Sequence, residues 1–450
     1  MPQEWRNWTG DQRCSPAVVE RPASLAELSD AVGRAGERGL GVRAAGSGHS
    51  FTEAPLTDGA MVRIEALGRV LDADPDSGLV KVEAGITLRD LSTVLWDLGL
   101  AMENLGDIDR QTLAGAIATA THGTGARFRN LSAQVESLEL VLADGSVREI
   151  SADSDGDAFL AARVGLGSLG VVYSVTLRCV PAFVMRRLDS PRPLEDTLAS
   201  IDQLAERNEH FEFYVFPYTD TALVIERNRT EAPPKPRGKA SAYLNEIVLE
   251  NYAMDVLSRI GRRFPSTIPT LVRFASRQFS RTEKTERSYR IFASERRVRF
   301  TEMEYAISRE QGPEAVRRVL DLVRERELPV GFPIEFRVVA PDDAFLSTAH
   351  ERETAYVAVH QYHGAVWEPY FRAVEEIMSG YGGRPHWGKR HFQTAETLAP
   401  LYPRWDDFQA VRARLDPAGR FANAYTERVL SPVTTGHGAR RYRKDLPSPR

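Results

Sequence analysis

The sequence of 450 residues contains only two cysteines, Cys14 and Cys179. Two cysteines build neither a disulfide framework nor a cysteine-rich metal cluster, and their scarcity fits a reducing compartment, so we expect a cytoplasmic protein. The sequence also lacks any run of about 18 apolar residues, so no membrane span is predicted. Because the first residues show no basic region followed by an apolar run, no signal peptide is predicted.

A large excess of charge of one sign is also missing. The net charge is −4, so no global field favours nucleic acid or an anionic membrane. The composition, 42% hydrophobic and 27% charged, is that of globular proteins, and the length suggests two or three domains. The sequence therefore describes a globular chain that is long enough to bury a large core.

A glycine-rich loop, Gly46-Ser47-Gly48-His49-Ser50-Phe51, is the most informative segment. Upstream, Ser24 is predicted to cap a helix that ends near Gly39, and residues 40–44 are predicted to form a strand that enters the loop. Glycines at this spacing let backbone N–H groups close on an anion such as a pyrophosphate. In a Rossmann site such a loop opens a helix, but here it runs into Pro55 without a helical period. A tight turn and a dinucleotide site of another architecture both remain open.

Two further clusters of small residues lie in the same 180-residue unit. Residues 112–125 are nearly all small and end in Thr121-His122-Gly123-Thr124-Gly125, and residues 165–170 carry three glycines just before a predicted strand. Small residues let a backbone approach a large flat ligand closely. Because three such clusters are hard to explain as turns alone, we predict one extended ligand that touches all three.

Local patterns predict the elements between these clusters. Residues 70–74 and 79–83 are predicted to form a hairpin, as are residues 137–142 and 147–150. Thr87 is predicted to cap a helix with a leucine face. Residues 1–180 thus alternate strands with short helices.

After Pro181 the glycine-rich turns disappear. Residues 257–300 contain twelve Lys or Arg against three Asp or Glu. We predict a solvated helical face there, with a patch for an anionic membrane or a partner as the alternative. The tail at 431–450 is rich in Pro, Gly, Arg and Ser and is predicted to be disordered.

Two segments of the C-terminal half carry polar chemistry. Within residues 333–337, strand geometry would place Glu335 and Arg337 on one face. An adjacent acid and guanidinium can bind and polarise an oxygenated substrate, and an exposed ion pair of little energetic value is the alternative. In the segment 386–389, Lys389 can place a positive charge near a developing anion.

No metal site is predicted. His360 and His363 lie three residues apart, which is a spacing that some metal sites use. The segment 356–362 alternates like a strand, however, and a strand would send the two histidines to opposite faces.

Taken together, these segments resemble the vanillyl-alcohol-oxidase type of FAD flavoprotein, and within it the aldonolactone oxidoreductases and the related alditol oxidases. The resemblance covers residues 10–430 and rests on motifs in the family's order: Gly46 to Phe51, Asn104-Leu105-Gly106-Asp107-Ile108, Ala118 to Gly125, Glu335-Phe336-Arg337, His386 to Lys389, and Phe421-Ala422-Asn423-Ala424-Tyr425. It implies an α+β fold with an FAD-binding domain at 1–181 and an antiparallel-sheet substrate domain at 182–404. It also implies that the segment 405–430 returns to the FAD domain.

The resemblance further implies how FAD is held. The glycine loop would wrap the pyrophosphate, and His49 would bond covalently to the flavin 8α-methyl group. The implied cofactor-binding residues are Ala44, Ala45, Gly46, Ser47, Gly48, His49, Ser50, Gly106, Asp107, Thr112, Gly115, Ala116, Ile117, Ala118, Thr121, His122, Val171 and His386.

For the substrate, the resemblance implies a site between the domains, against the flavin. Glu335 and Arg337 would hold the oxidised hydroxyl and the neighbouring carbonyl, and Lys389 would support negative charge on the reduced ring. A hydride would pass from the substrate to flavin N5, and either Glu335 or Lys389 would accept the proton. The implied substrate-binding residues are Asp107, Glu335, Arg337, Gln361 and Lys389.

The implied reaction is the oxidation of a sugar-derived lactone, such as L-gulono-1,4-lactone or D-arabinono-1,4-lactone. In this family a glycine beside flavin C4a accompanies reactivity towards oxygen and an alanine accompanies its loss, and Gly106 matches that position. We therefore expect oxygen as the electron acceptor and hydrogen peroxide as a product. The alternatives are an alditol oxidase, a membrane-associated dehydrogenase with another acceptor, and a flavin- or carbohydrate-binding protein without turnover. The joint presence of Glu335, Arg337 and Lys389 argues against the last of these.

Overall fold

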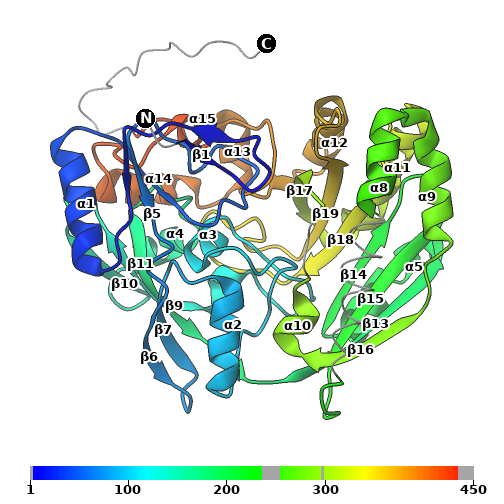
Figure 1. Cartoon of the computed structure of the whole chain (residues 1–450), viewed down its shortest axis with the longest axis horizontal. Coiled ribbons are helices and arrows are strands. Elements are labelled where there is room, and N and C mark those ends of the chain that lie inside the picture. Colours follow the sequence, from blue (N-terminus) through cyan, green and yellow to red (C-terminus); the bar gives the residue numbers. More distant parts are fainter. Residues whose placement is uncertain (1–3, 236–253, 295–297, 434–450) are drawn as a thin grey trace.

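The computed structural model describes residues 4–235, 254–294 and 298–433. Its sheets fall into two groups that lie side by side (Figure 1). The sheets of the N-terminal half lie on the left of the view together with the C-terminal helices. One large antiparallel sheet lies on the right. This mixture of helices and strands confirms the predicted α+β fold. The predicted tail lies outside the described residues from position 434 onward.

A small parallel sheet carries the glycine loop. Helix α1 (Leu25–Glu37) covers this sheet with a buried apolar stripe, and the side chain of Ser24 caps it by accepting from the N–H of Glu27. The predicted cap is therefore confirmed, although the strand into the loop begins only at Val42. The sheet has the order β3-β5-β4, with strands at Val18–Glu20, Ala60–Arg63 and Val42–Ala45.

A five-stranded antiparallel sheet completes the strands of this half, in the order β10-β9-β11-β7-β6. Both predicted hairpins are present, and β11 joins them by pairing with β9 on one side and β7 on the other. The strands are β6 (Val70–Asp74), β7 (Leu79–Glu83), β9 (Val135–Val141), β10 (Val147–Ser151) and β11 (Val171–Arg178).

Short helices fill the space around these strands. Helix α2 (Leu88–Asp97) begins at the predicted cap, where Thr87 accepts from the N–H of Asp90. The small-residue segment forms only one short helix, α3 (Leu113–Ala118), capped by Thr112. The other elements of this half are β1 (Trp5–Arg6), β2 (Arg13–Cys14), β8 (Leu100–Ala101), η1 (Leu131–Gln134), α4 (Gly156–Ala162) and β12 (Val180–Pro181).

The C-terminal segment packs into the core of the same half. Phe408 and Tyr425 are buried in one cluster with Leu91 of α2. Leu346 and Trp387 belong to this cluster too, so residues before the predicted boundary at 405 already share this core. The elements are α13 (Ala395–Leu398), η5 (Ala399–Leu401), α14 (Trp405–Leu415) and α15 (Ala424–Leu430).

The second half is an eight-stranded antiparallel sheet with the order β16-β13-β15-β14-β18-β19-β17-β20. Its long strands span β13 (Val184–Pro193), β14 (His210–Val215), β15 (Thr221–Arg229), β16 (Thr282–Arg287), β17 (Phe300–Ser308), β18 (Ile334–Val339), β19 (Thr354–Tyr362) and the short β20 (Arg384–Pro385).

Both faces of the central strands are buried, but they differ in chemistry. Met303, Phe336 and Val357 point to an apolar face that helices cover, and Glu302 and Glu335 point to the opposite, polar face. The covering helices are α5 (Leu194–Ala199), α6 (Ile201–Arg207), α11 (Gly312–Glu325) and α12 (Glu368–Ser379). The polar face is turned towards the first half, and this is where the candidate site lies.

The basic stretch is only partly helical. It includes η3 (Pro265–Thr267), α9 (Ile268–Ser276), strand β16 and α10 (Ser288–Phe292), and its positions 295–297 lie outside the described residues. Helix α8 (Met254–Arg263) begins just before this stretch and forms its first part, and η4 (Arg309–Gln311) precedes α11. Over the described ranges, no helix has both the length and the apolar content that crossing a bilayer requires.

Candidate active site

The glycine loop begins where β4 ends, and its glycines are required by close packing. Gly48 has a φ of +72°, in the left-handed region, and a Cβ there would lie 3.0 Å from the Trp5 ring and 3.3 Å from the Cα of Asn7. A Cβ on Gly46 would lie 2.1 Å from Oγ1 of Thr112, the cap residue of α3. The loop is therefore pressed against the start of α3 in a way that no larger residue allows.

The three clusters of small residues meet around one cavity of about 1030 Å³. The loop 44–50 forms one wall, α3 with Thr119 forms a second, and the cluster 165–170 with Val172 forms a third. Concave, mostly apolar sites with a few polar groups are where proteins hold cofactors. The predicted cofactor residues that line it are Ala44, Gly46, Ser47, Gly48, His49, Ser50, Thr112, Gly115, Ile117 and Ala118.

A buried arginine ties these walls together. Arg43 donates to the backbone carbonyls of Ala54 at 2.8 Å, Leu166 and Gly167 at 2.9 Å, and Phe421 at 2.6 Å. Burial lowers the pKa of the Arg43 guanidinium to about 10, so it is still charged at neutral pH. One side chain thus joins β4, the third cluster and the C-terminal segment.

His49 stands at the border of this cavity and a neighbouring one of about 1530 Å³. Its ring stacks on Trp8, with 5.5 Å between the ring centroids. Its Nδ1 atom is buried and has no hydrogen-bond partner among the described residues. Burial, with a smaller effect from Arg110, lowers the pKa of His49 to about 4. At neutral pH the imidazole is therefore uncharged, with a nitrogen that is free to bond.

These residues fit FAD. The positions where a Cβ would collide form a cradle of backbone and small side chains, which a long dinucleotide needs for close approach. The orphaned Nδ1 of His49 opens a place for a bond that the protein itself does not supply.

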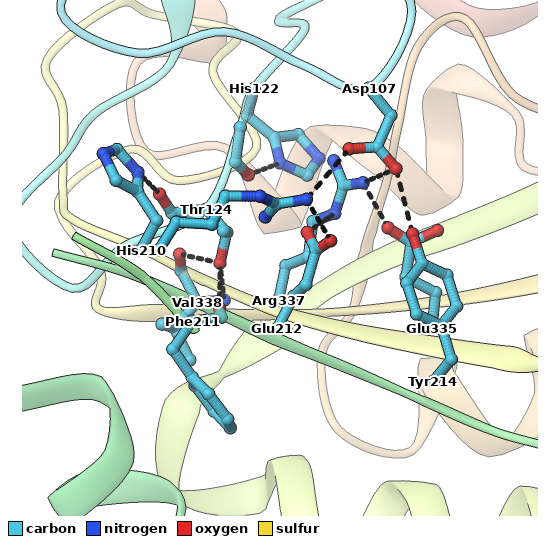
Figure 2. A network of polar contacts seen from close by, with 12 residues as sticks. Asp107, His122, Thr124, His210, Phe211, Glu212, Tyr214, Glu335, Arg337 and Val338 are labelled. Atoms are coloured by element: carbon cyan, nitrogen blue, oxygen red, sulfur yellow. Dashed lines mark hydrogen bonds and ion pairs between the residues drawn. The ribbon is translucent and has the colours of Figure 1, made fainter. Parts of the chain in front are cut away.

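A network of buried charges lies on the polar face of the sheet (Figure 2). Glu335 and Arg337 share that face of β18, as predicted, and form an ion pair. The guanidinium of Arg337 also lies 2.6 Å from Asp107 and 3.2 Å from Glu212. The hydroxyl of Tyr214 donates to Asp107 at 2.9 Å. Because Asp107 comes from the first half, the network joins the two halves of the molecule.

The acids outnumber the cations in this network. Arg337 and Arg227 face three carboxyl groups, those of Asp107, Glu212 and Glu335. A buried carboxylate without its own cation is costly, so one acid favours its protonated form. Burial raises the pKa of Glu335 to about 7, with Asp107 and Glu212 adding to the rise and Arg337 opposing it. Glu335 can therefore exchange a proton near neutral pH.

Lys389 belongs to a second charged cluster beside the first. Its Nζ forms an ion pair with Glu302 and lies 3.7 Å from Glu304. His360 connects the clusters, since its Nε2 lies 3.4 Å from Glu302 and 3.8 Å from Glu335. Burial alone would lower the pKa of Lys389, but the two glutamates outweigh it and raise the pKa. The lysine is thus a fixed cation.

Two further histidines complete this cluster. The Nε2 of His122 lies 3.3 Å from Glu304, and its ring stacks on Tyr356 with 3.6 Å between centroids. The backbone N–H of His386 donates to the carbonyl of Glu304 at 2.9 Å, which positions the segment that carries Lys389. Burial lowers the pKa of His386 to about 3, so this ring is neutral.

Within the described part of the chain, three groups of carboxylates and histidines lie close enough together to share a metal ion. Each of them already includes a protein cation, because Arg337 contacts the group around Asp107 and Lys389 contacts the groups around Glu302 and Glu304. Lysine and arginine thus supply the positive charge that a metal would bring.

Some predicted residues do not reach the site. Gln361 points to the opposite face of β19, where its amide donates to a backbone carbonyl at 3.2 Å, so its predicted substrate role is not supported. Ala45, Ala116 and Val171 pack into apolar cores, and Val172 rather than Val171 lines the cavity. Strand alternation accounts for the last difference, because neighbouring side chains face opposite sides.

Gly106 and Thr121 lie where the two halves meet. A Cβ on Gly106 would lie 3.1 Å from the carbonyl oxygen of His122 and 3.5 Å from the methyl group of Thr121. The hydroxyl of Thr121 accepts from the amide of Gln111 at 3.2 Å. Even one methyl group at position 106 would therefore require a shift of its neighbours.

Four acids and bases of the site were missed by the sequence reasoning: Glu212, Glu302, Glu304 and His360. A signal was available in β17, which reads Thr-Glu-Met-Glu-Tyr and alternates acids with apolar residues. The alternation shows that the acids share a face, but nothing local shows that this face is covered.

Comparison with known proteins agrees with this geometry. The family model described as D-arabinono-1,4-lactone oxidase matches residues 175–429, and the model described as FAD binding domain matches residues 16–151. An L-gulono-1,4-lactone dehydrogenase of Mycobacterium tuberculosis (strain ATCC 25618 / H37Rv) is 54% identical over 428 residues, which cover 95% of this chain and 99% of that protein.

More distant relatives carry other names. The L-gulonolactone oxidase of Mus musculus is 34% identical and covers 95% of this chain and 98% of its own length. An alditol oxidase of a Streptomyces species is 31% identical, with 94% and 98% covered. Among solved structures, a solvent-stable cholesterol oxidase superposes with a TM-score of 0.80 at 18% identity, covering 95% of this chain and 97% of that chain, and so shares the fold.

Proposed function

The chain belongs to the D-arabinono-1,4-lactone oxidase family and is an FAD-dependent oxidoreductase, and on this premise we propose that it oxidises a sugar-derived 1,4-lactone. Substrates of the L-gulono-1,4-lactone or D-arabinono-1,4-lactone type fit the proposal. The observation that carries it is the buried pair Glu335 and Arg337, which faces the FAD-binding half across the polar surface of the sheet.

When bound, FAD supplies the two-electron acceptor for the oxidation of a CH–OH carbon. The chain's own residues orient the substrate and manage its proton. A guanidinium has five N–H donors, so Arg337 can hold its three carboxylates and still donate to a substrate oxygen. The positive charge of Lys389 stabilises negative charge that develops in the site.

We propose that Glu335 is the general base that accepts the proton of the substrate hydroxyl group as it is oxidised. A general base is most effective when its pKa lies near the working pH, and the pKa of Glu335 is raised to about 7. Lys389 is a poor base because Glu302 and Glu304 hold it protonated. His360, between Glu302 and Glu335, keeps the carboxylate of Glu335 oriented.

We propose that FAD is attached covalently, through a bond between Nδ1 of His49 and the flavin 8α carbon. The absence of a hydrogen-bond partner for this buried atom among the described residues supports the assignment, as does its uncharged state at neutral pH. The stacked ring of Trp8 restricts the imidazole to one orientation.

For the electron acceptor we propose molecular oxygen, with hydrogen peroxide as the product. Gly106 supports this choice because the position carries no Cβ that would narrow the space for oxygen beside the flavin. The name of the Mycobacterium tuberculosis relative favours a second candidate, a dehydrogenase that passes its electrons to another acceptor. The two free cysteines, Cys14 and Cys179, support a cytoplasmic location for either enzyme.

One experiment separates these possibilities. Initial rates are measured in air, by peroxide formation, and without oxygen, with a soluble dye, for L-gulono-1,4-lactone, D-arabinono-1,4-lactone and xylitol. We expect a higher kcat/KM for a lactone than for xylitol, with peroxide released in air. A preference for xylitol would establish an alditol oxidase instead, and turnover with the dye alone would establish a dehydrogenase. A protein that stays oxidised with every substrate would contradict the proposed function.

A further inference from the structure

The exposed large apolar side chains of this protein are not scattered. Seven are exposed within the described ranges, and two of them, Leu71 and Val147, lie apart on strands of the FAD-binding half. The other five gather on α8 and α9 and beside them: Val256, Ile260, Phe264, Phe274 and Val366. Phe264 and Phe274 are 55% and 61% exposed. Such a concentration marks an interaction surface rather than ordinary surface composition.

The helices α8 and α9 are apolar on two sides. Val256, Ile260 and Phe264 are spaced four residues apart and so follow one outer face of α8 and its end. The inner sides of the pair, with Ile268 and Val272, cover a cavity of about 870 Å³ above the end of the sheet. The outer face is therefore additional to the packing that holds the helices in place. In Figure 1 this pair stands at the outer edge of the molecule, far from the FAD-binding half.

The same segment is strongly basic. Residues 254–281 contain six arginines and one acid, Asp255, whereas the whole chain has a net charge of −4. Asp255 is itself paired with Arg259 at 2.8 Å. Arg263 and Arg273 are exposed next to Phe264 and Phe274. Exposed aromatic and aliphatic residues among arginines, with almost no acid, are the composition of helices that lie in the interface of an anionic bilayer.

We propose that the outer face of α8 and α9 docks this protein onto an anionic lipid bilayer as a peripheral membrane protein. Phe264 and Phe274 enter the headgroup region, and the arginines around them contact lipid phosphates. The face carries no site residue, so docking is separate from catalysis. A protein partner would need an acidic and apolar surface of matching shape, whereas a bilayer needs only the composition that this face has.

The test is co-sedimentation of the FAD-loaded full chain with vesicles. Vesicles of 30% phosphatidylglycerol in phosphatidylcholine are compared with vesicles of phosphatidylcholine alone, at 0.1 M and 0.5 M NaCl. We expect binding to the anionic vesicles at low salt, at least tenfold weaker binding to neutral vesicles, and release at high salt. No binding to the anionic vesicles would overturn the proposal.

Two variants locate the surface. Phe264→Ser with Phe274→Ser should weaken vesicle binding at least tenfold, and the matched pair Leu71→Ser with Val147→Ser should not. If the first variant loses its flavin absorbance and so fails to fold, Arg273→Gln with Arg277→Gln should give the same loss. Equal binding by the variants would overturn the proposal. So would light scattering that shows a dimer dissociated by the phenylalanine changes, since a second copy would then cover this face.

Discussion

His49 lies at the wall of the cofactor cavity, its Nδ1 is buried without a hydrogen-bond partner among the described residues, and burial keeps its ring uncharged. His210, His350 and His391 also have a buried ring nitrogen without a hydrogen-bond partner among those residues, but none of them lines this cavity. No described residue compensates Nδ1 of His49, which is an unfavourable arrangement unless a ligand completes it.

We therefore predict that flavin stays with the acid-precipitated wild-type protein and that His49→Ala releases it to the supernatant. The measurement is flavin absorbance in pellet and supernatant, and His363→Ala, at a histidine away from the cavity, is the control. Flavin that remains with the pellet of the His49 variant would refute covalent attachment at this residue.

The ionisation of Glu335 is expected to set how kcat/KM depends on pH. A base must be ionised to accept a proton, so kcat/KM should fall about tenfold per pH unit below the pKa of about 7. Replacing Glu335 by Gln should lower kcat by about 10²–10⁴-fold and remove the acid limb of the profile. The measurement is kcat/KM from pH 5 to 9 on enzyme whose flavin spectrum is unchanged. An acid limb that persists in the variant would assign the base to another residue.

At the scale of elements, Asn423 connects the C-terminal helix to the glycine loop. Its Oδ1 accepts from the N–H of Thr426 and caps α15. Its amide donates to the carbonyls of Glu53 at 3.0 Å, Ala54 at 3.1 Å and Leu56 at 2.9 Å. One side chain thus fixes the turn that follows the cofactor loop.

We predict that Asn423→Ala lowers the free energy of unfolding by about 2–4 kcal/mol, since it removes both the cap and three hydrogen bonds. Asn423→Ser is the matched control, because it keeps a capping oxygen and loses only the donors, and it should recover about 1 kcal/mol of that loss. Denaturant unfolding of the FAD-loaded protein measures both. Equal stability of the serine variant and the wild type would show that the three carbonyl contacts contribute nothing.

The elements also show what the sequence could and could not predict. The caps Ser24 and Thr87, both hairpins and the shared face of Glu335 and Arg337 were predictable, because each depends on residues a few positions apart. Local patterns did not predict the contact of Asp107 with Arg337, because it joins two halves of the chain; only the family resemblance placed both residues in one substrate site.

The reach of local sequence patterns also explains why some site residues were predicted wrongly. For Val171 and Val172, a motif match does not fix which of two neighbours faces the cavity, since one step along a strand reverses the face. The burial that raises the pKa of Glu335, and the neighbouring acids that add to the rise, could not be predicted from the sequence, because both depend on how the fold brings distant segments together.

At the scale of the whole molecule, buried titratable groups govern stability towards acid. Burial lowers the pKa of His210, His386 and His391 to about 3, so on unfolding each takes up a proton below about pH 6.5. Burial raises the pKa of Glu335 to about 7 and of Asp342 to about 6, so these two release a proton on unfolding above about pH 4.3.

These three histidines and His49, whose pKa burial lowers to about 4, outnumber the two carboxyl groups, so about two protons are taken up on unfolding between pH 4.5 and 6.5. Stability rises with pH where the unfolded state binds more protons, so we predict a loss of about 2.7 kcal/mol per pH unit as the pH falls through this range. Denaturant unfolding at pH 4.5, 5.5 and 6.5 measures this change in the free energy of unfolding. A free energy of unfolding that increases towards acid would show that the carboxyl groups dominate.

The return of the C-terminal segment to the FAD-binding half has a consequence for biosynthesis. The guanidinium of Arg43 donates to the carbonyl of Phe421, and the N–H of Val42 donates to the carbonyl of Arg420. The first half therefore lacks these two hydrogen bonds when it leaves the ribosome. The eight-stranded sheet must be synthesised before those partners arrive. The cavity is lined by residues 43–172, but the contacts that fix β4 beside it form only after nearly the whole chain has been synthesised.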